Sequence, residues 1–374
     1  MAGGFRKLTK GFFVLGNLAV AVLFLLGCYA SFFDPKYFWF IGLFTLASLY
    51  LLLILFFFII FWLLVKKKLM LISIIAMLLA WVPLSHLLKI KFRDNFTLAK
   101  TTGNLRVMSW NIEHFDILEH RTHPEIKVEM LDLISRYRPD IACFQEMVGN
   151  EKDSTAINYV PFFKQRLQFS DYYYSYNQKL DFDAKHHFGI IIFSKYPIIE
   201  KHTISYEPNT YNSIFQYVDI VKEADTFRVF NIHLQSMKFS DINRQYIDDP
   251  TMKNEIDIEK SKNILSKFKT GFFKRKDQSE RIKAAMNASP HPVIVCGDFN
   301  DVPNSYAYSV IGRGMKNSFA EKGSGIGRTF ASIAPTLRID NIFTDKRFMT
   351  EQFTRVKKKL SDHFPIIADL SYRP

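Results

Sequence analysis

The distribution of apolar residues divides the chain into two unlike parts. Residues 11–32, 40–65 and 69–88 are nearly uncharged apolar stretches, each about as long as a helix that crosses the ~30 Å hydrocarbon core of a bilayer. A buried core helix would be shorter and amphipathic, so the pattern predicts three transmembrane helices. A cleavable signal peptide is not expected, because two more stretches follow the first one directly. We therefore expect a membrane anchor over 1–90 and a linker over 91–103.

From residue 104 to residue 374 the pattern alternates between strand-like and helix-like segments. Apolar and β-branched runs predict eight strands, over 105–112, 140–146, 189–194, 213–221, 227–234, 293–297, 339–343 and 365–370. Helices are predicted over 124–138 and 157–169, and the charged segment 237–290 is helical in character. Because strands outnumber helices, the pattern favours an α/β fold of two packed sheets with helices outside.

Polar residues gather at the ends of these strands. In VIVCGDFNDVPNS (293–305), for example, an apolar run breaks into Gly, Asp, Phe, Asn and Asp. One such ending is explained by an ordinary turn, but six strands show the same feature. The residues concerned are Asn111, Glu146, Asn231, His233, Asp298, Asn300, Asp340, Asp362 and His363. Gathered carboxylates repel one another, so a bound cation is expected, and oxygen ligands without cysteine favour Mg²⁺ or Mn²⁺.

The motifs around these residues resemble those of a known family. SWNIEHF, QEM, NIHLQS, GDFND, RIDNIF and SDHFPI occur in the order found in the endonuclease/exonuclease/phosphatase superfamily, over about residues 104–372. The resemblance is most specific in GDFN combined with the terminal SDH. It implies a four-layered α/β sandwich and a metal-dependent hydrolase acting on phosphoric ester bonds. The histidine in NIHL is similar to that of the deoxyribonuclease and sphingomyelinase branches.

The resemblance also implies a set of metal ligands. Glu146 is expected to be the principal Mg²⁺ ligand, with Asn111 beside the metal and Asp362 as a further candidate. The alternative for Glu146 is a surface cap, although the apolar run before it makes this strand interior.

The remaining residues are assigned catalytic roles by the same resemblance. Asp298 would orient or deprotonate the attacking water, and Asn300 would hold a phosphate oxygen. His363 would contact the scissile phosphate, with Asp340 fixing its orientation through the second ring nitrogen. His233 would donate a hydrogen bond to the phosphate or protonate the leaving group, and the alternative for it is a core histidine.

The net charge of +13 is concentrated in the N-terminal part. Residues 1–100 hold 11 Lys or Arg and 2 Asp or Glu, whereas residues 101–374 hold 38 and 34. The basic residues therefore indicate the orientation of the chain in the membrane more than a nucleic-acid binding surface. Basic residues before the first stretch and at 66–68 predict a cytoplasmic N-terminus. With three crossings, the C-terminal domain would then be extracytoplasmic, on a multi-pass protein of the cell membrane, although Lys89, Lys91 and Arg93 argue weakly against this.

Three further features have alternative explanations. His186 and His187 either contact substrate or belong to a solvated loop. The loop GIGRTFAS (325–332) lacks the Lys-Ser/Thr of a nucleotide-binding loop, so it is expected to be a shaped loop near the site. A basic run either meets anionic lipid headgroups or nucleic acid, or forms a solvated helix face with interleaved acids. It consists of Lys260, Lys262, Lys267, Lys269, Lys274, Arg275, Lys276, Arg281 and Lys283.

These observations favour a membrane-anchored, Mg²⁺-dependent phosphodiester hydrolase that acts on nucleic acid or phospholipid headgroups by in-line attack of water. A charge of only +4 over residues 101–374 slightly disfavours a nuclease that grips many phosphates, and the tether slightly favours a lipid. The alternative is a catalytically silent binding or scaffold protein with the same fold, which would be marked by a lost catalytic residue. The expected partners are the bilayer and the phosphodiester substrate, and no obligate protein partner is evident.

Overall fold

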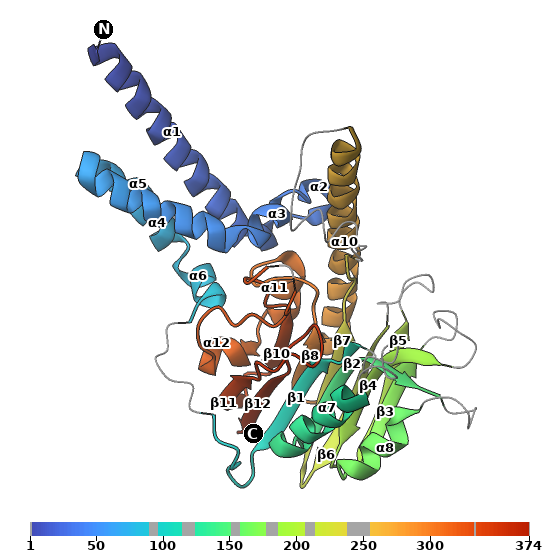
Figure 1. The fold of residues 1–374 in the computed structure, drawn as a ribbon. Helices are drawn as coiled ribbons and strands as arrows, with labels where there is room; N and C mark the ends of the chain where they lie inside the picture. Colours follow the sequence, from blue (N-terminus) through green and yellow to red (C-terminus); the bar gives the residue numbers. More distant parts are fainter. Residues whose placement is uncertain are drawn as a thin grey trace.

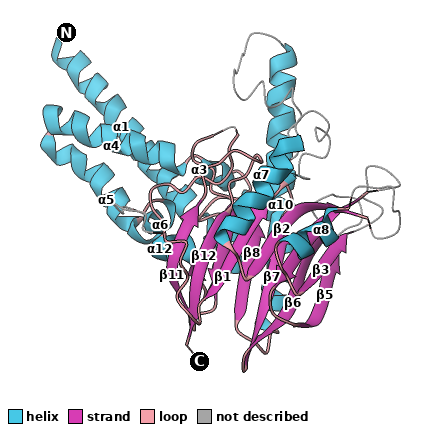
Figure 2. Cartoon of the chain, turned by 60° about the horizontal axis from the view of Figure 1, so that its bottom comes forward, coloured by secondary structure: helices cyan, strands magenta, loops and turns pink. Residues whose placement is uncertain are grey.

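The computed structural model describes residues 2–89, 96–113, 124–150, 158–176, 186–205, 214–237, 255–332 and 334–373. Its C-terminal part contains two mixed, six-stranded sheets packed against each other, with helices on their outer faces (Figures 1 and 2). The first sheet has the order β11 (Phe348–Arg355), β12 (Ile366–Tyr372), β1 (Leu105–Asn111), β2 (Ile141–Gly149), β4 (His187–Ser194), β3 (Asp171–Tyr176). The second has the order β5 (Ile198–Ser205), β6 (Ile214–Lys222), β7 (Asp225–His233), β8 (Val293–Asp298), β10 (Asp340–Thr344), β9 (Lys316–Asn317).

Three apolar cores separate the four layers. The central core lies between the sheets, where Val107 and Cys143 of the first sheet meet Val229 and Ile294 of the second. One outer core joins the first sheet to α7 (Pro124–Tyr137) and α8 (Tyr159–Arg166). The other joins the second sheet to α10 (Glu255–Asn287) and α11 (Tyr306–Gly312), and α12 (Ser318–Lys322) packs against β10 and β11. The four-layered α/β sandwich is therefore confirmed.

The predicted elements correspond closely to the observed ones. All eight predicted strands are present, as are helices over most of 124–138 and 157–169. The predicted helical segment 237–290 contains α10, and its residues 238–254 lie outside the described part. Strands β3, β5, β9 and β11 and helices α11 and α12 were not predicted. Of the predicted linker 91–103, residues 91–95 lie outside the described part as well.

The N-terminal part is a bundle of apolar helices. It contains α1 (Ala2–Cys28), α2 (Pro35–Phe38), α3 (Ile41–Leu46), α4 (Ser48–Val65), α5 (Leu71–Leu79) and α6 (Trp81–Leu87), with 3₁₀ turns at Ala30–Phe32 and Lys67–Met70. Within the described residues, two helices, Lys7–Cys28 and Ser48–Val65, are long and apolar enough to cross a membrane. The third predicted span is bent by 70° between Lys67–Leu79 and Trp81–Leu87, so it counts as a crossing only if the bent pair is one span.

The bundle docks directly onto the C-terminal domain. The side-chain amide of Asn304 donates to the Pro83 carbonyl at 2.9 Å, and its oxygen lies 3.1 Å from Nδ1 of His86. The His86 carbonyl accepts from the buried guanidinium of Arg338. Lys89 pairs with Gly325 as an isolated β-bridge. Helix α6 is therefore joined both to the loop after β8 and to the loop before β10.

Candidate active site

The polar residues predicted from the sequence come together at one end of the two sheets. Asn111 ends β1, which runs parallel to β2, and His233 ends β7, which runs parallel to β8. Asp298 ends β8, whereas Asp340 begins the antiparallel β10, so both lie at the same sheet edge. Asp362 and His363 precede β12 at that edge.

The backbone of β8 aligns three of these residues in register. Asp298 is paired with His233 on one side and with Asp340 on the other. The residue before it, Gly297, has φ +146°, and a Cβ atom there would lie 2.0 Å from the carbonyl oxygen of Ile232. Only glycine lets β8 approach β7 this closely, so the glycine of GDFND helps to fix the position of the aspartate that follows it.

One carboxylate oxygen is the centre of the site. Oδ2 of Asp298 lies 3.1 Å from Nδ2 of Asn300, 3.4 Å from Nδ2 of Asn111, 3.5 Å from Nε2 of His233 and 3.7 Å from Nε2 of His363. Oδ1 accepts from the backbone N–H of Asn300 at 2.8 Å. Burial alone would raise the pKa of Asp298, but the charge of His363 and the hydrogen bond from His233 outweigh it and lower that pKa. Asp298 is therefore a buried carboxylate held in its ionised form.

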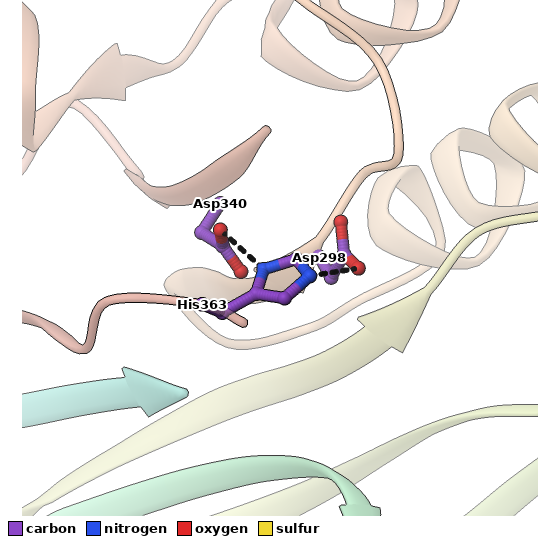
Figure 3. A group of neighbouring side chains, drawn as sticks. All are labelled: Asp298, Asp340 and His363. Carbon is purple, nitrogen blue, oxygen red and sulfur yellow. Dashed lines mark hydrogen bonds and ion pairs between the residues drawn. The ribbon is translucent and has the colours of Figure 1, made fainter. Parts of the chain in front are cut away.

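His363 is clamped between two aspartates (Figure 3). Its Nδ1 lies 2.9 Å from Oδ2 of Asp340, and its carbonyl accepts from the indole N–H of Trp110 at 2.9 Å. Burial would lower the pKa of His363, but the carboxylates of Asp340 and Asp298 raise it well above its ordinary value. Ligand atoms of Asp298, Asp340 and His363 all lie within 4.8 Å of one another, so this group has the composition and spacing of a metal site.

Glu146 faces the same centre from the first sheet. It has φ +58° and lies where the register between β2 and β4 shifts, between Phe144 and Met147. The sequence placed Glu146 at the end of its strand, but β2 continues to Gly149. The register shift is a β-bulge, and this bulge turns the Glu146 side chain toward Asn111 and His233. Its Oε1 accepts from Nδ2 of Asn111 at 3.2 Å and lies 3.7 Å from Nε2 of His233.

The side chain of Glu146 is more exposed than that of His233 beside it. Its side chain is 27% exposed, whereas that of His233 is 5% exposed. Burial would lower the pKa of His233, but the hydrogen bond and charge of Asp298 raise it. Solvent therefore reaches the site on the side of Glu146.

Two residues at the site were not singled out from the sequence. Glu113 accepts from the backbone N–H of Asp362 at 2.8 Å, and desolvation by its neighbours together with the charge of Asp362 raises its pKa to about 7. Ser361 donates from its hydroxyl to the Asn111 carbonyl at 2.8 Å and accepts from the His363 N–H at 3.1 Å. Glu113 belongs to the SWNIEHF stretch and Ser361 to the LSDHFPI stretch. Each is two residues from a predicted site residue, Asn111 or His363, and this proximity in sequence could have identified them.

Two asparagines make contacts that the sequence did not indicate. Asn231 faces the space between the sheets, where its amide donates to the carbonyls of Phe144 and Ile191 and its oxygen accepts from Gln145. It therefore ties the two sheets together and does not line the site. The amide of Asn300 donates to the Leu234 carbonyl at 2.9 Å as well as to Asp298. Its predicted contact with a phosphate oxygen stays a prediction.

The loop 325–332 and His187, for which the sequence left alternatives open, lie at the same end of the sheets as the site. The loop 325–332 is confirmed as part of the site's frame, since the Phe330 ring packs edge-on against His363 at 5.0 Å and Thr329 accepts from the Asp340 N–H at 3.1 Å. His187 begins β4 and is buried, with its ring stacked on Tyr176 at 4.2 Å. The solvated-loop alternative is therefore wrong for His187, and contact of either histidine with substrate stays a prediction.

Comparisons with known proteins agree with this architecture. A model of the endonuclease/exonuclease/phosphatase family matches residues 108–363, and residues 10–87 match a family described as a domain of unknown function (DUF8431). A search of curated proteins found no similar sequence.

Solved structures are similar to this chain at low sequence identity. One is an endonuclease/exonuclease/phosphatase family protein from Bacteroides thetaiotaomicron, with 17% identity, a TM-score of 0.51 and coverage of 74% of this chain and 100% of that one. Another is the human nocturnin catalytic domain, with 16% identity, a TM-score of 0.49 and coverage of 72% and 94%. Truncated Caenorhabditis elegans TDP2 has 17% identity, a TM-score of 0.49 and coverage of 73% and 100%.

Proposed function

Since the chain belongs to the endonuclease/exonuclease/phosphatase family, we propose that it is a divalent-metal-dependent phosphodiester hydrolase held at a bilayer by its N-terminal helices. The observation that carries this proposal is the convergence of two histidines and two asparagines on one oxygen of Asp298. A buried carboxylate with donors on several sides and histidines beside it is suited to positioning a water molecule against an anionic ester.

The donor set fits a hard divalent cation. Glu146 and Asp298 bring two carboxylate oxygens within 3.2 and 3.4 Å of one atom, Nδ2 of Asn111, so an ion between them would have two oxygen ligands. The Asn111 oxygen accepts from the Glu113 N–H at 3.1 Å, so Asn111 would turn its amide to offer that oxygen to the ion. The described cysteines are buried elsewhere, in α1 and in the strands, so oxygen ligands dominate here, as Mg²⁺ and Mn²⁺ require. We assign Glu146 and Asn111 as the residues that hold the ion, with Asp362 beside them. The ion would offset the negative charge that builds on the phosphate oxygens during attack.

The Asp298–Asp340–His363 group is assigned to proton handling and orientation instead. Nδ1 of His363 is already engaged by Asp340 at 2.9 Å, so only Nε2 is directed at Asp298. That nitrogen can donate to a phosphate oxygen while Asp340 keeps the ring in one orientation. His233, between Glu146 and Asp298, can donate to the phosphate or to the leaving group.

Asp298 is assigned to the attacking water. Its two oxygens accept hydrogen bonds from Asn300 and Asn111, which fix the plane of the carboxylate. A carboxylate held in this way can accept a hydrogen bond from water and orient it for in-line attack on phosphorus.

The way the anchor meets the domain supports the proposed topology. The segment between α1 and α4 contacts the domain, since Asp34 lies 3.8 Å from Lys276. If α1 and α4 both cross the bilayer, Lys66–Lys68 lie on the side opposite this segment. The domain is then on the other side from Lys66–Lys68, and the bent α5–α6 pair must be the third crossing. With basic residues on the cytoplasmic side, the site is extracytoplasmic.

Activity on a generic diester tests the proposal. The purified full-length chain is expected to cleave bis-p-nitrophenyl phosphate with Mg²⁺ or Mn²⁺ and to lose this activity in a chelator. Glu146→Gln should lower turnover and shift the metal dependence upward, so that part of the loss returns at high metal concentration. Absence of turnover with every divalent ion, in a protein that binds the metal, would favour a silent scaffold. If the chain does cleave the generic diester, its relative rates on nucleic acids, phosphoinositides and sphingomyelin, measured in parallel, would identify the substrate class.

A further inference from the structure

Helix α10 extends beyond the sheets on the side of the membrane anchor (Figures 1 and 2). Its C-terminal half is buried on the second sheet, with Arg275, Ile282 and Met286 all at 5% exposure or less. Its N-terminal half is more open, with Lys262 and Leu265 exposed. This half lies outside the site and was not needed to explain it.

The helix meets the anchor at the segment between α1 and α4. Asp34 of this segment lies 3.8 Å from Lys276, and a Cβ atom on Gly42 would lie 2.6 Å from the Phe272 ring. If α1 and α4 span the bilayer, as proposed above, this segment is at the bilayer surface. Residues 260–271 continue from that contact on the anchor side, so they lie at the level of the lipid headgroups.

The open half of α10 is uniformly basic. Residues 260–276 contain six lysines, one arginine and no acidic residue. The lysines form two rows with a spacing of seven residues, which is about 10.5 Å along a helix. Lys260, Lys267 and Lys274 lie on one side and are partly buried, whereas Lys262, Lys269 and Lys276 lie on about the opposite side, where Lys262 and Lys269 are exposed. The acids that would make this a neutral solvated face lie at positions 255, 257 and 259 and from 277 onward. Lys276 is paired with Asp34 and Glu280, so Lys262 and Lys269 carry the positive charge that faces solvent on this side of the helix.

We propose that residues 260–274 of α10 dock on anionic phospholipid headgroups of the leaflet from which the anchor emerges. This rests on the proposed membrane anchoring and not on the proposed hydrolysis. Each lysine at such a surface contributes about 1 kcal/mol, or roughly a fivefold change in the docked-to-free ratio. The exposed Leu265 lies on the same stretch, where it can enter the boundary between headgroups and acyl chains.

Docking would bear on the active site through Arg275. This buried arginine lies 3.1 Å from Asp301 and donates to the Gln235 carbonyl at 2.9 Å. Asp301 follows Asn300, and Gln235 is two residues beyond His233. A helix fixed on headgroups therefore holds both catalytic loops at a set orientation to the bilayer.

A fluorophore near the lysine rows tests the docking. The full chain, carrying Asn263→Cys, is labelled and placed in nanodiscs that contain lipids with a quencher on the headgroup. The three natural cysteines are buried, so the label is directed to position 263. We expect strong quenching in discs with anionic phosphatidylglycerol, weaker quenching in phosphatidylcholine, and loss of the difference near 1 M salt, where the screening length falls to about 3 Å.

Matched substitutions make the test specific. Lys262→Gln and Lys269→Gln together should lower the docked-to-free ratio roughly 25-fold, at about fivefold each, while glutamine keeps a similar helix propensity. The control removes two exposed cations at the opposite end of the sheets, with Arg136→Gln and Lys346→Gln, and should leave quenching unchanged.

The outcomes separate this proposal from the proposed anchoring. Equal quenching in both lipids, unaffected by the lysine substitutions, would overturn the docking. A label at the exposed Tyr37, introduced as Tyr37→Cys, should be quenched in every lipid if the anchor is inserted, and no quenching there would overturn the anchoring itself. A larger response of the 263 label to a single-stranded oligonucleotide than to anionic lipid would assign the basic rows to nucleic acid instead.

Discussion

At the scale of single residues, the position of Asp298 determines what the site can do. Its Oδ2 is the point shared by Asn111, Asn300, His233 and His363, which come from different strands and loops. Each of these donors can be removed without removing the carboxylate, and the carboxylate can be neutralised without removing the donors. The proposed roles are therefore separable by substitution.

Asp298→Asn should preserve the shape of the site while removing the negative acceptor. We expect turnover of bis-p-nitrophenyl phosphate to fall roughly 10²–10⁴-fold, as for the loss of a positioned acid or base. Steady-state kinetics at saturating metal measures this, with metal affinity and melting temperature as controls for folding. Wild-type turnover in this variant would remove the water-positioning role from Asp298.

Asp340 and His363 should behave as one unit. Because Asp340 engages Nδ1 of His363 at 2.9 Å, Asp340→Asn and His363→Ala are each expected to lower turnover strongly. The double variant should lose little more than the worse single one, since residues that act together give non-additive losses. Losses that multiply in the double variant would show that Asp340 does not act through His363.

At the scale of elements, sequence patterns predicted the interior strands and missed the edges. The eight predicted strands are the eight interior strands of the two sheets, and β3, β5, β9 and β11 are the four edges. Interior strands are covered on both faces, so VIVCG and IACF read as unbroken apolar runs. The edge strands DYYYSY, IIEKHTIS and FMTEQFTR carry polar and charged residues, as edges must to avoid further pairing.

The site could be predicted for a related reason, and only in part. Polar residues at the ends of several predicted strands, together with the family resemblance, were enough to group Asn111, His233, Asp298 and His363, although the order of the strands was not predicted. The bulge that aims Glu146 and the inward turn of Asn231 depend on pairing between strands far apart in the chain. No local pattern encodes such pairing.

The junction of β7 and β8 should tolerate no side chain at position 297. Gly297→Ala adds backbone strain of about 1–3 kcal/mol and a clash with the Ile232 carbonyl at 2.0 Å. We expect a lower melting temperature and lower turnover, since Asp298 would move with its strand. Gly314→Ala is the matched control, because Gly314 also has positive φ, +78°, but has no atom within 4 Å. Equal destabilisation by the two variants would show that close strand approach has no role.

At the scale of the whole molecule, the side of the membrane on which the site lies can be measured. Reporter fusions at residue 100 should behave as extracytoplasmic, and fusions near Lys67 as cytoplasmic, because the domain contacts Asp34 and Asp34 lies opposite Lys66–Lys68 if α1 and α4 both cross. The reverse pattern would place the site in the cytoplasm, and equal behaviour at both positions would show that the bent α5–α6 pair does not cross.

The contact of α6 with the loops that follow β8 and precede β10 has a consequence for how the domain can be handled. A soluble fragment beginning near residue 100 would lack Pro83, His86 and Leu87, which cover Asn304, Tyr308 and Pro303. Arg338 would lose the His86 carbonyl as an acceptor, while its hydrogen bond to the Ile326 carbonyl would remain. Such a fragment would expose apolar surface that α6 covers in the intact chain, and exposed apolar surface promotes self-association. We therefore expect the intact chain in detergent or lipid, and not this fragment, to be the form suited to biochemical study.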